Sequence, residues 1–172
     1  VPLPENTPRI KNPNPSVSNK KVSLYMLTFN FPEQVEYTLN TLKNNSSDWL
    51  EKPRKILIDN STNEGARLAN KEIADKWGFE HIVMNDNKGI NGGRLFAAEH
   101  FAQSDSDFYF FFEDDMGLHS SSETGYCRNG FRKYVPNLYE NLQKIMVREG
   151  FDFLKFSFTE VYMDNHIQVS WY

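Results

Sequence analysis

Three consecutive carboxylates, Glu113, Asp114 and Asp115, directly follow a run of five aromatic residues at 108–112. Because like charges held close together repel, at least one of these carboxyl groups needs a raised pKa unless a cation neutralises the cluster. A hard divalent ion with oxygen ligands would let all three ionise. The triplet therefore predicts either a metal site or, in the simpler interpretation, a solvated acidic turn.

A glycine-rich segment, NKGINGG at 87–93, precedes the acidic triplet along the chain. Glycines allow backbone amides to approach a ligand closely, and a helix beginning near Gly92 points its positive end outward. Lys88 and Arg94 add positive charge beside it. Alone, the segment indicates a loop that needs glycine, because it matches neither the dinucleotide-binding nor the phosphate-loop pattern. With the triplet, it predicts a metal-bridged phosphate ligand.

Apolar runs alternate along the chain with segments of helical periodicity, which predicts a series of strand and helix units. Asn30 with Glu33, and Ser61 with Glu64, have the spacing of capping boxes at the starts of two helices, and Gly78 is expected to end the second. The expected strands cover 22–29, 55–59, 80–84 and 108–112, and further helices are expected over 94–102 and 138–146.

Strands that alternate with helices favour right-handed crossovers and a mostly parallel, Rossmann-like sheet with helices on both faces. The predicted class is therefore α/β. In such sheets ligands collect at the carboxyl ends of the strands. The segments expected at that edge are 28–30, 59–61, 87–94 and 113–115.

Composition excludes several classes of function for this chain of 172 residues. Its 19 basic and 23 acidic residues give a net charge of −4, which argues against nucleic acid as a partner. No apolar run approaches the roughly 18 residues of a membrane span, and the start lacks a signal-peptide pattern. The single cysteine, Cys127, cannot close an intrachain disulfide, which favours a reducing compartment. We expect a cytoplasmic location, with membrane association only through parts outside this chain.

Proline separates the start of the chain from the rest, because five of the eight prolines lie within the first 15 residues. Residues 1–20 are therefore expected to form an extended linker, and 21–172 a single domain. Since the chain starts at Val1 with a linker, we expect a longer parent protein with other domains.

Four ordered segments resemble the GT-A-fold glycosyltransferases of the family 2 type, which use nucleotide-diphosphate sugars. The resemblance covers roughly 21–118. The segments are similar to the family's first strand and helix, its second-strand motif ending in Asp and Ser, its Asn-x-Gly segment with a downstream Arg, and the strand carrying its D-x-D motif. They read VSLYMLTFNFPEQVEYTLNTL, ILIDNSTNE, NDNKGINGGRLFAAEH and FYFFFEDDM. The resemblance implies a GT-A-type nucleotide-sugar-binding domain over 21–172.

The resemblance implies donor-binding roles for residues at the expected carboxyl edge. Phe29 would lie against the nucleotide base, in place of the Tyr often found there, and Asn30 falls in the same donor-binding segment. Asp59 would accept a hydrogen bond from the base, which points to uracil. Arg94 would approach the diphosphate or the sugar.

The resemblance also implies roles within the acidic triplet. Asp114 would contact the ribose or the sugar, and Asp115 would bind the metal. Glu113 stands where the family often has Asp and is the second candidate metal ligand. Mn²⁺ or Mg²⁺ suits these oxygen ligands, and either ion would stabilise the charge that develops on the departing nucleoside diphosphate.

An inverting enzyme needs a carboxylate to take the proton of the acceptor hydroxyl, and in the family this residue follows the D-x-D strand. Glu160 and Asp164, after the aromatic stretch 151–158, are the two candidates. The simpler interpretation is that both are surface turn carboxylates. The chain ends where the family builds its acceptor-binding half, so either that part lies outside this chain or it is unusually small.

Three functional hypotheses follow. The first is a metal-dependent glycosyltransferase of the hexosyltransferase type that transfers a sugar from a UDP-sugar to a saccharide or a lipid-linked acceptor. The second is a nucleotidyltransferase, which would need a basic residue in the loop after 22–29, where the chain has none. The third is a non-catalytic interaction module of the same fold, whose carboxylates would bind no metal.

Overall fold

The computed structural model describes residues 16–116, 137–152, 154, 161–163 and 166–168. The chain divides into two compact units, one of Lys20–His119 and one of Val1–Asn19 with Ser120–Tyr172. We call the first the sheet unit. Among the helices of the described residues, none is both long and apolar enough to cross a bilayer.

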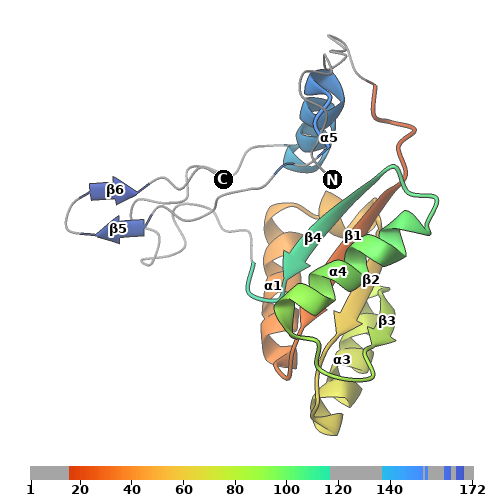
Figure 1. The fold of residues 1–172 in the computed structure, drawn as a ribbon, viewed down its shortest axis with the longest axis vertical. Helices are drawn as coiled ribbons and strands as arrows, with labels where there is room; N and C mark the ends of the chain where they lie inside the picture. The colour runs from red at the N-terminus through yellow and green to blue at the C-terminus, as the bar shows by residue number, and fades with distance from the viewer. Residues whose placement is uncertain (1–15, 117–136, 153, 155–160, 164–165, 169–172) are drawn as a thin grey trace, which may run out of the picture. The chain divides into compact units, whose positions relative to one another are not determined.

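The sheet unit is built on four parallel strands in the order β3-β2-β1-β4 (Figure 1). The predicted α/β class and parallel sheet are therefore confirmed. The strands are β1 (Val22–Thr28), β2 (Arg54–Asp59), β3 (Glu80–Val83) and β4 (Phe108–Glu113). The helices are α1 (Pro32–Asn45), α2 (Asp48–Glu51), α3 (Glu64–Trp77) and α4 (Gly89–Ala102).

Helix α4 covers one face of this sheet (Figure 1). Tyr25 and Leu27 of β1, Ile56 and Ile58 of β2, and Ala97 of α4 form a buried cluster on that face. Because successive side chains of a strand point to opposite faces, the intervening residues of β1 and β2 must be buried by other helices. This is why both strands are apolar at nearly every position, as parallel strands covered on both faces are.

The opposite face packs against the remaining helices of the unit. Trp49 of α2 is buried there and meets Phe110 and Phe112 of β4 edge-on, with ring centroids 4.6 and 5.2 Å apart. Helices α1 and α3 contact each other, and α3 contacts β2 and β3. The aromatic run of β4 thus supplies rings to both faces of the sheet, since Tyr109 and Phe111 join the α4 cluster.

Strand register brings the polar segments to one edge. Thr28 of β1 lies opposite Asp59 of β2, and Leu27 of β1 lies opposite Glu113 of β4. The carboxyl ends of these three strands are therefore level. The residues that follow them are forced into the same region of space, as the sequence predicts.

Both predicted capping boxes are wrong in detail. Helix α1 begins after Phe31, which provides no side-chain cap, and α3 begins after Asn63, whose Oδ1 accepts a hydrogen bond from Ala66 N at 3.0 Å. Asn30 and Ser61 instead bond to each other, because Ser61 Oγ accepts from Asn30 N at 2.8 Å. This bond between two loops engages both residues, and neither of them caps a helix. The predicted stop at Gly78 is confirmed, with φ of 70°.

Helix α4 begins earlier than the glycine content of its first turn suggests. It starts at Gly89, so Gly92 and Gly93 lie inside the helix rather than in a loop. Only Gly89 of these three has a positive φ, at 64°. Gly93 instead allows a close approach, because a Cβ there would lie 2.6 Å from both terminal methyl carbons of Leu27. Its role is to let the helix pack onto β1.

The second unit contains a helix and a hairpin among its described residues. Helix α5 (Leu138–Glu149) covers the predicted helix and ends at Gly150, which has φ of 65°. Strands β5 (Val161–Met163) and β6 (His166–Gln168) pair antiparallel.

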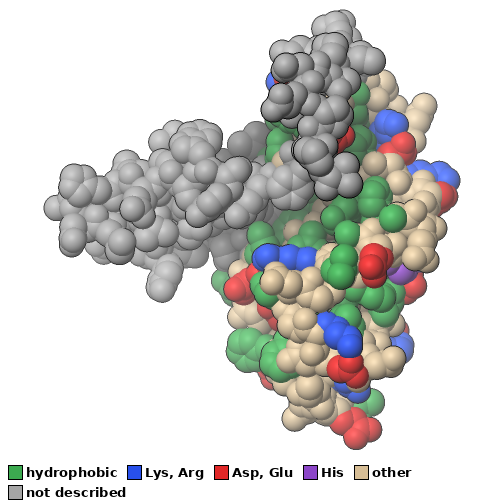
Figure 2. All heavy atoms as spheres, viewed as in Figure 1, with side chains coloured by type: hydrophobic (Ala, Val, Ile, Leu, Met, Phe, Trp, Pro, Cys, Tyr) green, Lys and Arg blue, Asp and Glu red, His purple; other side chains and the backbone are tan. Residues whose placement is uncertain are grey.

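Charges are mixed on the visible face of the sheet unit. Figure 2 shows acidic and basic side chains interspersed there, with hydrophobic side chains between them. This face therefore presents no continuous area of one sign. Elsewhere in the sheet unit, charges are also paired, as in the ion pairs Lys71 with Asp75 and Arg54 with Glu80.

Candidate functional site

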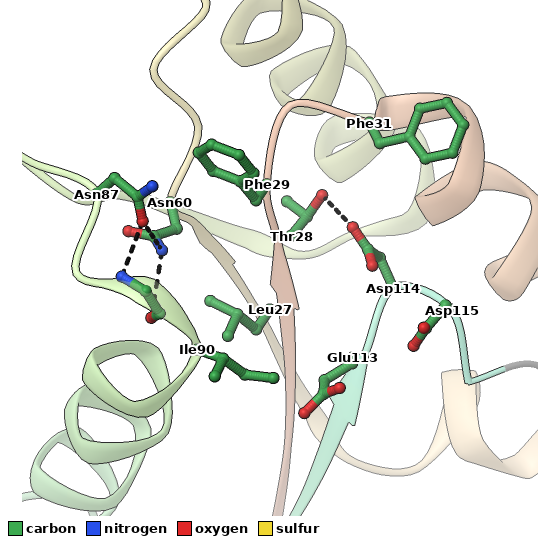
Figure 3. Close-up of a pocket in the computed structure, with 11 residues that line it drawn as sticks. Leu27, Thr28, Phe29, Phe31, Asn60, Asn87, Ile90, Glu113, Asp114 and Asp115 are labelled. Atoms are coloured by element: carbon green, nitrogen blue, oxygen red, sulfur yellow. Dashed lines mark hydrogen bonds between the residues drawn. The ribbon is translucent and has the colours of Figure 1, made fainter.

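A cleft of about 340 Å³ opens at the carboxyl ends of β1, β2 and β4, beside the first turn of α4 (Figure 3). It draws its lining from all four segments that the sequence places at this edge. The lining residues are Leu27, Thr28, Phe29, Phe31, Asn60, Asn87, Gly89, Ile90, Glu113, Asp114 and Asp115.

Asp114 is the most constrained member of the acidic triplet. Its Oδ2 accepts a hydrogen bond from Thr28 Oγ1 at 2.8 Å, its backbone N–H donates to Leu27 O at 3.1 Å, and its carbonyl accepts from Thr38 Oγ1. Burial, with a smaller contribution from the charge of Asp115, raises the pKa of Asp114 despite the hydrogen bonds. A nearby cation would reverse this shift, because it favours the ionised form.

Asp115 and Glu113 differ from Asp114 in their partners. The Asp115 carboxylate is exposed and has no hydrogen-bond partner among the described residues. Glu113 forms an ion pair with Arg94 of α4. The structure thus joins Glu113, a predicted metal ligand, to Arg94, a predicted diphosphate-binding residue, in an ion pair.

The donor set suits a hard cation only in part. All of the groups at the acidic edge are carboxylate oxygens, which Mg²⁺ and Mn²⁺ prefer. Within the described part of the chain, however, no three His, Cys, Asp or Glu side chains converge as a metal-binding group. An ion at this edge would therefore have to take most of its oxygens from a ligand such as a diphosphate and from water.

Aromatic and aliphatic side chains also line the cleft. Phe29 is 45% exposed, Phe31 55% and Ile90 46%, although each is large and apolar. Figure 3 draws Phe29 and Phe31 on either side of Thr28. Large apolar side chains left exposed around a cleft indicate a surface that a ligand covers.

Two asparagines build the glycine turn. Asn60 is buried at the end of β2, where its Nδ2 donates to Asn87 Oδ1 at 2.8 Å and its Oδ1 accepts from Lys88 N at 2.9 Å. Asn87 Oδ1 accepts a second bond from Gly89 N at 2.8 Å. These bonds fix the chain just before α4 and so set where the helix begins.

Asn30 holds two loops together at the rim of the cleft. Its φ is 56°, and its Oδ1 accepts from the backbone N–H groups of Thr62 and Asn63, both at 2.9 Å. Its Nδ2 donates to Thr62 Oγ1 at 3.1 Å. The side chain is therefore engaged in joining the β1–α1 and β2–α3 loops, and its predicted contact with a donor remains a prediction.

Asp59 lies beneath the cleft rather than in its lining. It is fully buried, and its Oδ1 accepts from Ser61 N while its Oδ2 accepts from His81 Nε2, each at 2.9 Å. Burial alone would raise the pKa of Asp59, but the hydrogen bonds from His81 and Ser61 hold it below the usual value. Both carboxylate oxygens are thus occupied within the protein, and the predicted bond from Asp59 to a base remains a prediction.

Four of the predicted site residues line the cleft together, namely Phe29, Glu113, Asp114 and Asp115. Arg94 is not among the lining residues, but it forms an ion pair with Glu113, which is. The two candidate catalytic bases, Glu160 and Asp164, lie outside the described residues.

Sequence reasoning assigned no role to Asn60, Asn87 or Ile90. Asn60 and Asn87 do lie within segments predicted for the strand ends, which is the one signal that could have found them. The hydrogen bond between Asn60 and Asn87 joins two segments that lie 27 residues apart in the sequence. In comparisons with known proteins, neither a family model nor a curated protein matches the chain.

Proposed function

We propose that the sheet unit is the donor-binding domain of a metal-dependent glycosyltransferase with a GT-A-type fold. In this proposal the enzyme transfers a sugar from a nucleoside-diphosphate donor, a UDP-sugar, to a saccharide or lipid-linked acceptor. The observation that carries the proposal is the convergence at one strand edge of an exposed aromatic ring, a carboxylate pair and an arginine. These are groups suited to a base, a metal and a diphosphate.

Each part of the donor has a counterpart in the cleft. The exposed ring of Phe29 offers a stacking surface for the base. Asp115, with Glu113 as the second candidate ligand, would hold the ion, and Asp114 would contact the ribose or the sugar. Arg94, whose side chain is half exposed, can turn from Glu113 to the phosphates. When bound, the divalent ion would stabilise the charge that develops on the departing nucleoside diphosphate. Glu160 and Asp164 remain candidate bases for the acceptor hydroxyl.

The nucleotidyltransferase hypothesis gains no support from the β1–α1 loop. Residues 29–31 read Phe-Asn-Phe and offer no basic side chain for a triphosphate. UTP is therefore the useful competitor in any binding test, because an enzyme that uses triphosphates should prefer it to UDP.

Calorimetric titration of UDP tests the proposal. We expect UDP to bind in the presence of Mn²⁺, to lose most of its affinity in EDTA, and to bind at least as tightly as UTP. Asp115→Ala should abolish the metal-dependent part of the affinity. Glu72→Ala is the matched control, because Glu72 is an exposed carboxylate on α3. Binding of UDP that ignores both EDTA and Asp115→Ala would refute the proposal.

A further inference from the structure

One left-handed residue separates two exposed aromatic side chains in the turn between β1 and α1. Asn30 has φ of 56°, and Phe29 and Phe31 beside it are both exposed. In an extended chain, side chains two residues apart project to the same face. The backbone at Asn30 breaks that pattern, and the two rings lie on opposite sides of Thr28 (Figure 3). The conformation of Asn30 therefore sets where both rings lie.

Four hydrogen bonds hold Asn30 in this conformation, and we call them the Asn30 clamp. Its N–H donates to Ser61 Oγ at 2.8 Å. Its Oδ1 accepts from the N–H groups of Thr62 and Asn63, and its Nδ2 donates to Thr62 Oγ1. Ser61 is fully buried, and its Oγ also accepts from Asn70 Nδ2 at 3.4 Å, so the clamp is anchored in the protein interior. A left-handed residue other than glycine persists where its surroundings hold it, and such residues are concentrated at functional sites.

The two rings flank different parts of the cleft. In Figure 3 the asparagine pair of the glycine turn, Asn60 and Asn87, lies on the side of Phe29. The carboxylates at 114–115 lie on the side of Phe31. All of these residues line the cleft, so a ligand that reaches from the glycine turn to the acidic edge passes both rings. Rings that are already in place spare such a ligand the free-energy cost of ordering them.

We propose that Asn30 is a positioning residue, whose clamp holds Phe29 and Phe31 on opposite sides of Thr28 before a ligand enters the cleft. This inference rests on the proposed function for the identity of the ligand, whereas the hold on the rings exists whether or not a ligand is bound. Asn30 acts through the rings and not by contact, because its N–H, Oδ1 and Nδ2 are all bonded within the protein. Without the clamp, fewer molecules have both rings in place, and the apparent affinity falls by that fraction.

Two substitutions open the clamp from opposite sides. Asn30→Gly adopts the same φ without strain but loses the three bonds made by the side chain. Ser61→Ala removes the acceptor of the fourth bond from within the protein, at a residue that does not line the cleft. Asn85→Gly is the matched control, because Asn85 is an exposed loop asparagine outside the cleft lining.

Carbon-13 relaxation of the aromatic rings tests the proposal without any ligand. We expect the rings of Phe29 and Phe31 to become more mobile in Asn30→Gly and in Ser61→Ala, and to keep their native mobility in Asn85→Gly. The ring of Phe112, which is buried, is the internal reference and should not change. Native mobility of both exposed rings in Asn30→Gly would overturn the proposal. Should Asn30→Gly fail to fold, the same measurement on Ser61→Ala decides.

Binding kinetics of UDP with Mg²⁺, from NMR line shapes during titration, distinguish positioning from direct contact. We expect Asn30→Gly to slow association about tenfold and to leave the dissociation rate within about twofold of the native rate, because the bound state is unchanged once the rings are in place. Asn85→Gly should keep both native rates. Faster dissociation with native association would overturn the proposal, since Asn30 would then contact the ligand itself. Failure of the native chain to bind UDP would overturn the proposed function, and ring mobility would still decide the role of Asn30.

Discussion

Gly93→Ala should destabilise the protein, although it places a good helix former inside a helix. In an open helix position, replacing Gly by Ala stabilises by about 1 kcal/mol. At Gly93 the new Cβ would lie 2.6 Å from both terminal methyl carbons of Leu27 and 3.1 Å from its Cγ. Because Leu27 is itself buried in the cluster beneath α4, its methyl groups can yield only toward the cleft that Leu27 also lines.

The magnitude follows from overpacking. Inserting one carbon into a packed core typically costs about 1–3 kcal/mol of unfolding free energy. Leu27→Ala alone should cost about 2–5 kcal/mol, because it removes buried methyl groups and leaves a cavity. In the double variant the cause of the clash is gone, so adding Gly93→Ala to Leu27→Ala should be neutral or stabilising by up to about 1 kcal/mol.

Urea unfolding, followed by tryptophan fluorescence, measures all four free energies of this cycle. We expect Gly93→Ala to cost stability in the native background and to be neutral or stabilising beside Leu27→Ala, which is a coupling of about 1–4 kcal/mol between positions 27 and 93. This expectation would be refuted by a stabilising effect of Gly93→Ala in the native background. An equal cost in both backgrounds would also refute it, since the contact with Leu27 would then be irrelevant.

Three further substitutions test the electrostatics of the site. Burial raises the pKa of Asp114, so ionisation of its carboxyl group costs stability as the pH rises through the folded-state pKa. Asp114→Asn should therefore raise the melting temperature, measured by calorimetry, more at pH 7 than at pH 4. An increase that does not depend on pH would contradict this expectation. His81→Phe should lower the unfolding free energy in urea by about 1–3 kcal/mol at pH 7, because it leaves one oxygen of the buried Asp59 carboxylate without its hydrogen-bond donor. No measurable loss would disprove the pairing. Glu113→Gln should change stability by less than about 1 kcal/mol, yet raise the affinity for UDP in EDTA by freeing Arg94; unchanged calorimetric affinity would show that the ion pair does not compete with the ligand.

The four strands of the parallel sheet could be predicted to within one residue at each end because they obey a simple physical rule. Parallel strands covered on both faces must be apolar at successive positions, and β1, with seven buried residues in a row, shows this fully. Helix boundaries were harder, since Ser61 and Asn63 are both suitable N-caps by sequence. The tertiary bond from Asn30 N to Ser61 Oγ decided between them.

The start of α4 could not be predicted from local propensity. Glycines at 89, 92 and 93 disfavour a helix by sequence alone. Packing of Gly93 on Leu27 and the bonds from Asn60 to the preceding turn outweigh that preference. Both depend on residues distant in the sequence, so only the folded chain reveals them.

For the candidate site, the acidic edge was predictable because its residues are consecutive and follow a recognisable strand. The orientation of each carboxylate was not. Asp59 and Asp114 both follow apolar strands, yet Asp59 pairs with His81 beneath the cleft whereas Asp114 bonds to Thr28 within it. Such differences arise from neighbouring strands, which a single segment of sequence does not contain.

Paramagnetic broadening by Mn²⁺ in the presence of UDP tests most directly whether the strand edge binds a metal and a nucleotide together, as we propose. In amide spectra of the labelled chain, substoichiometric Mn²⁺ should broaden the signals of Phe29, Asp114 and Asp115 first. Gly78, at the far end of α3, should keep its signal. Asp115→Ala should abolish the selective broadening. Broadening centred elsewhere, or unaffected by Asp115→Ala, would show that the metal does not bind at this edge of the sheet.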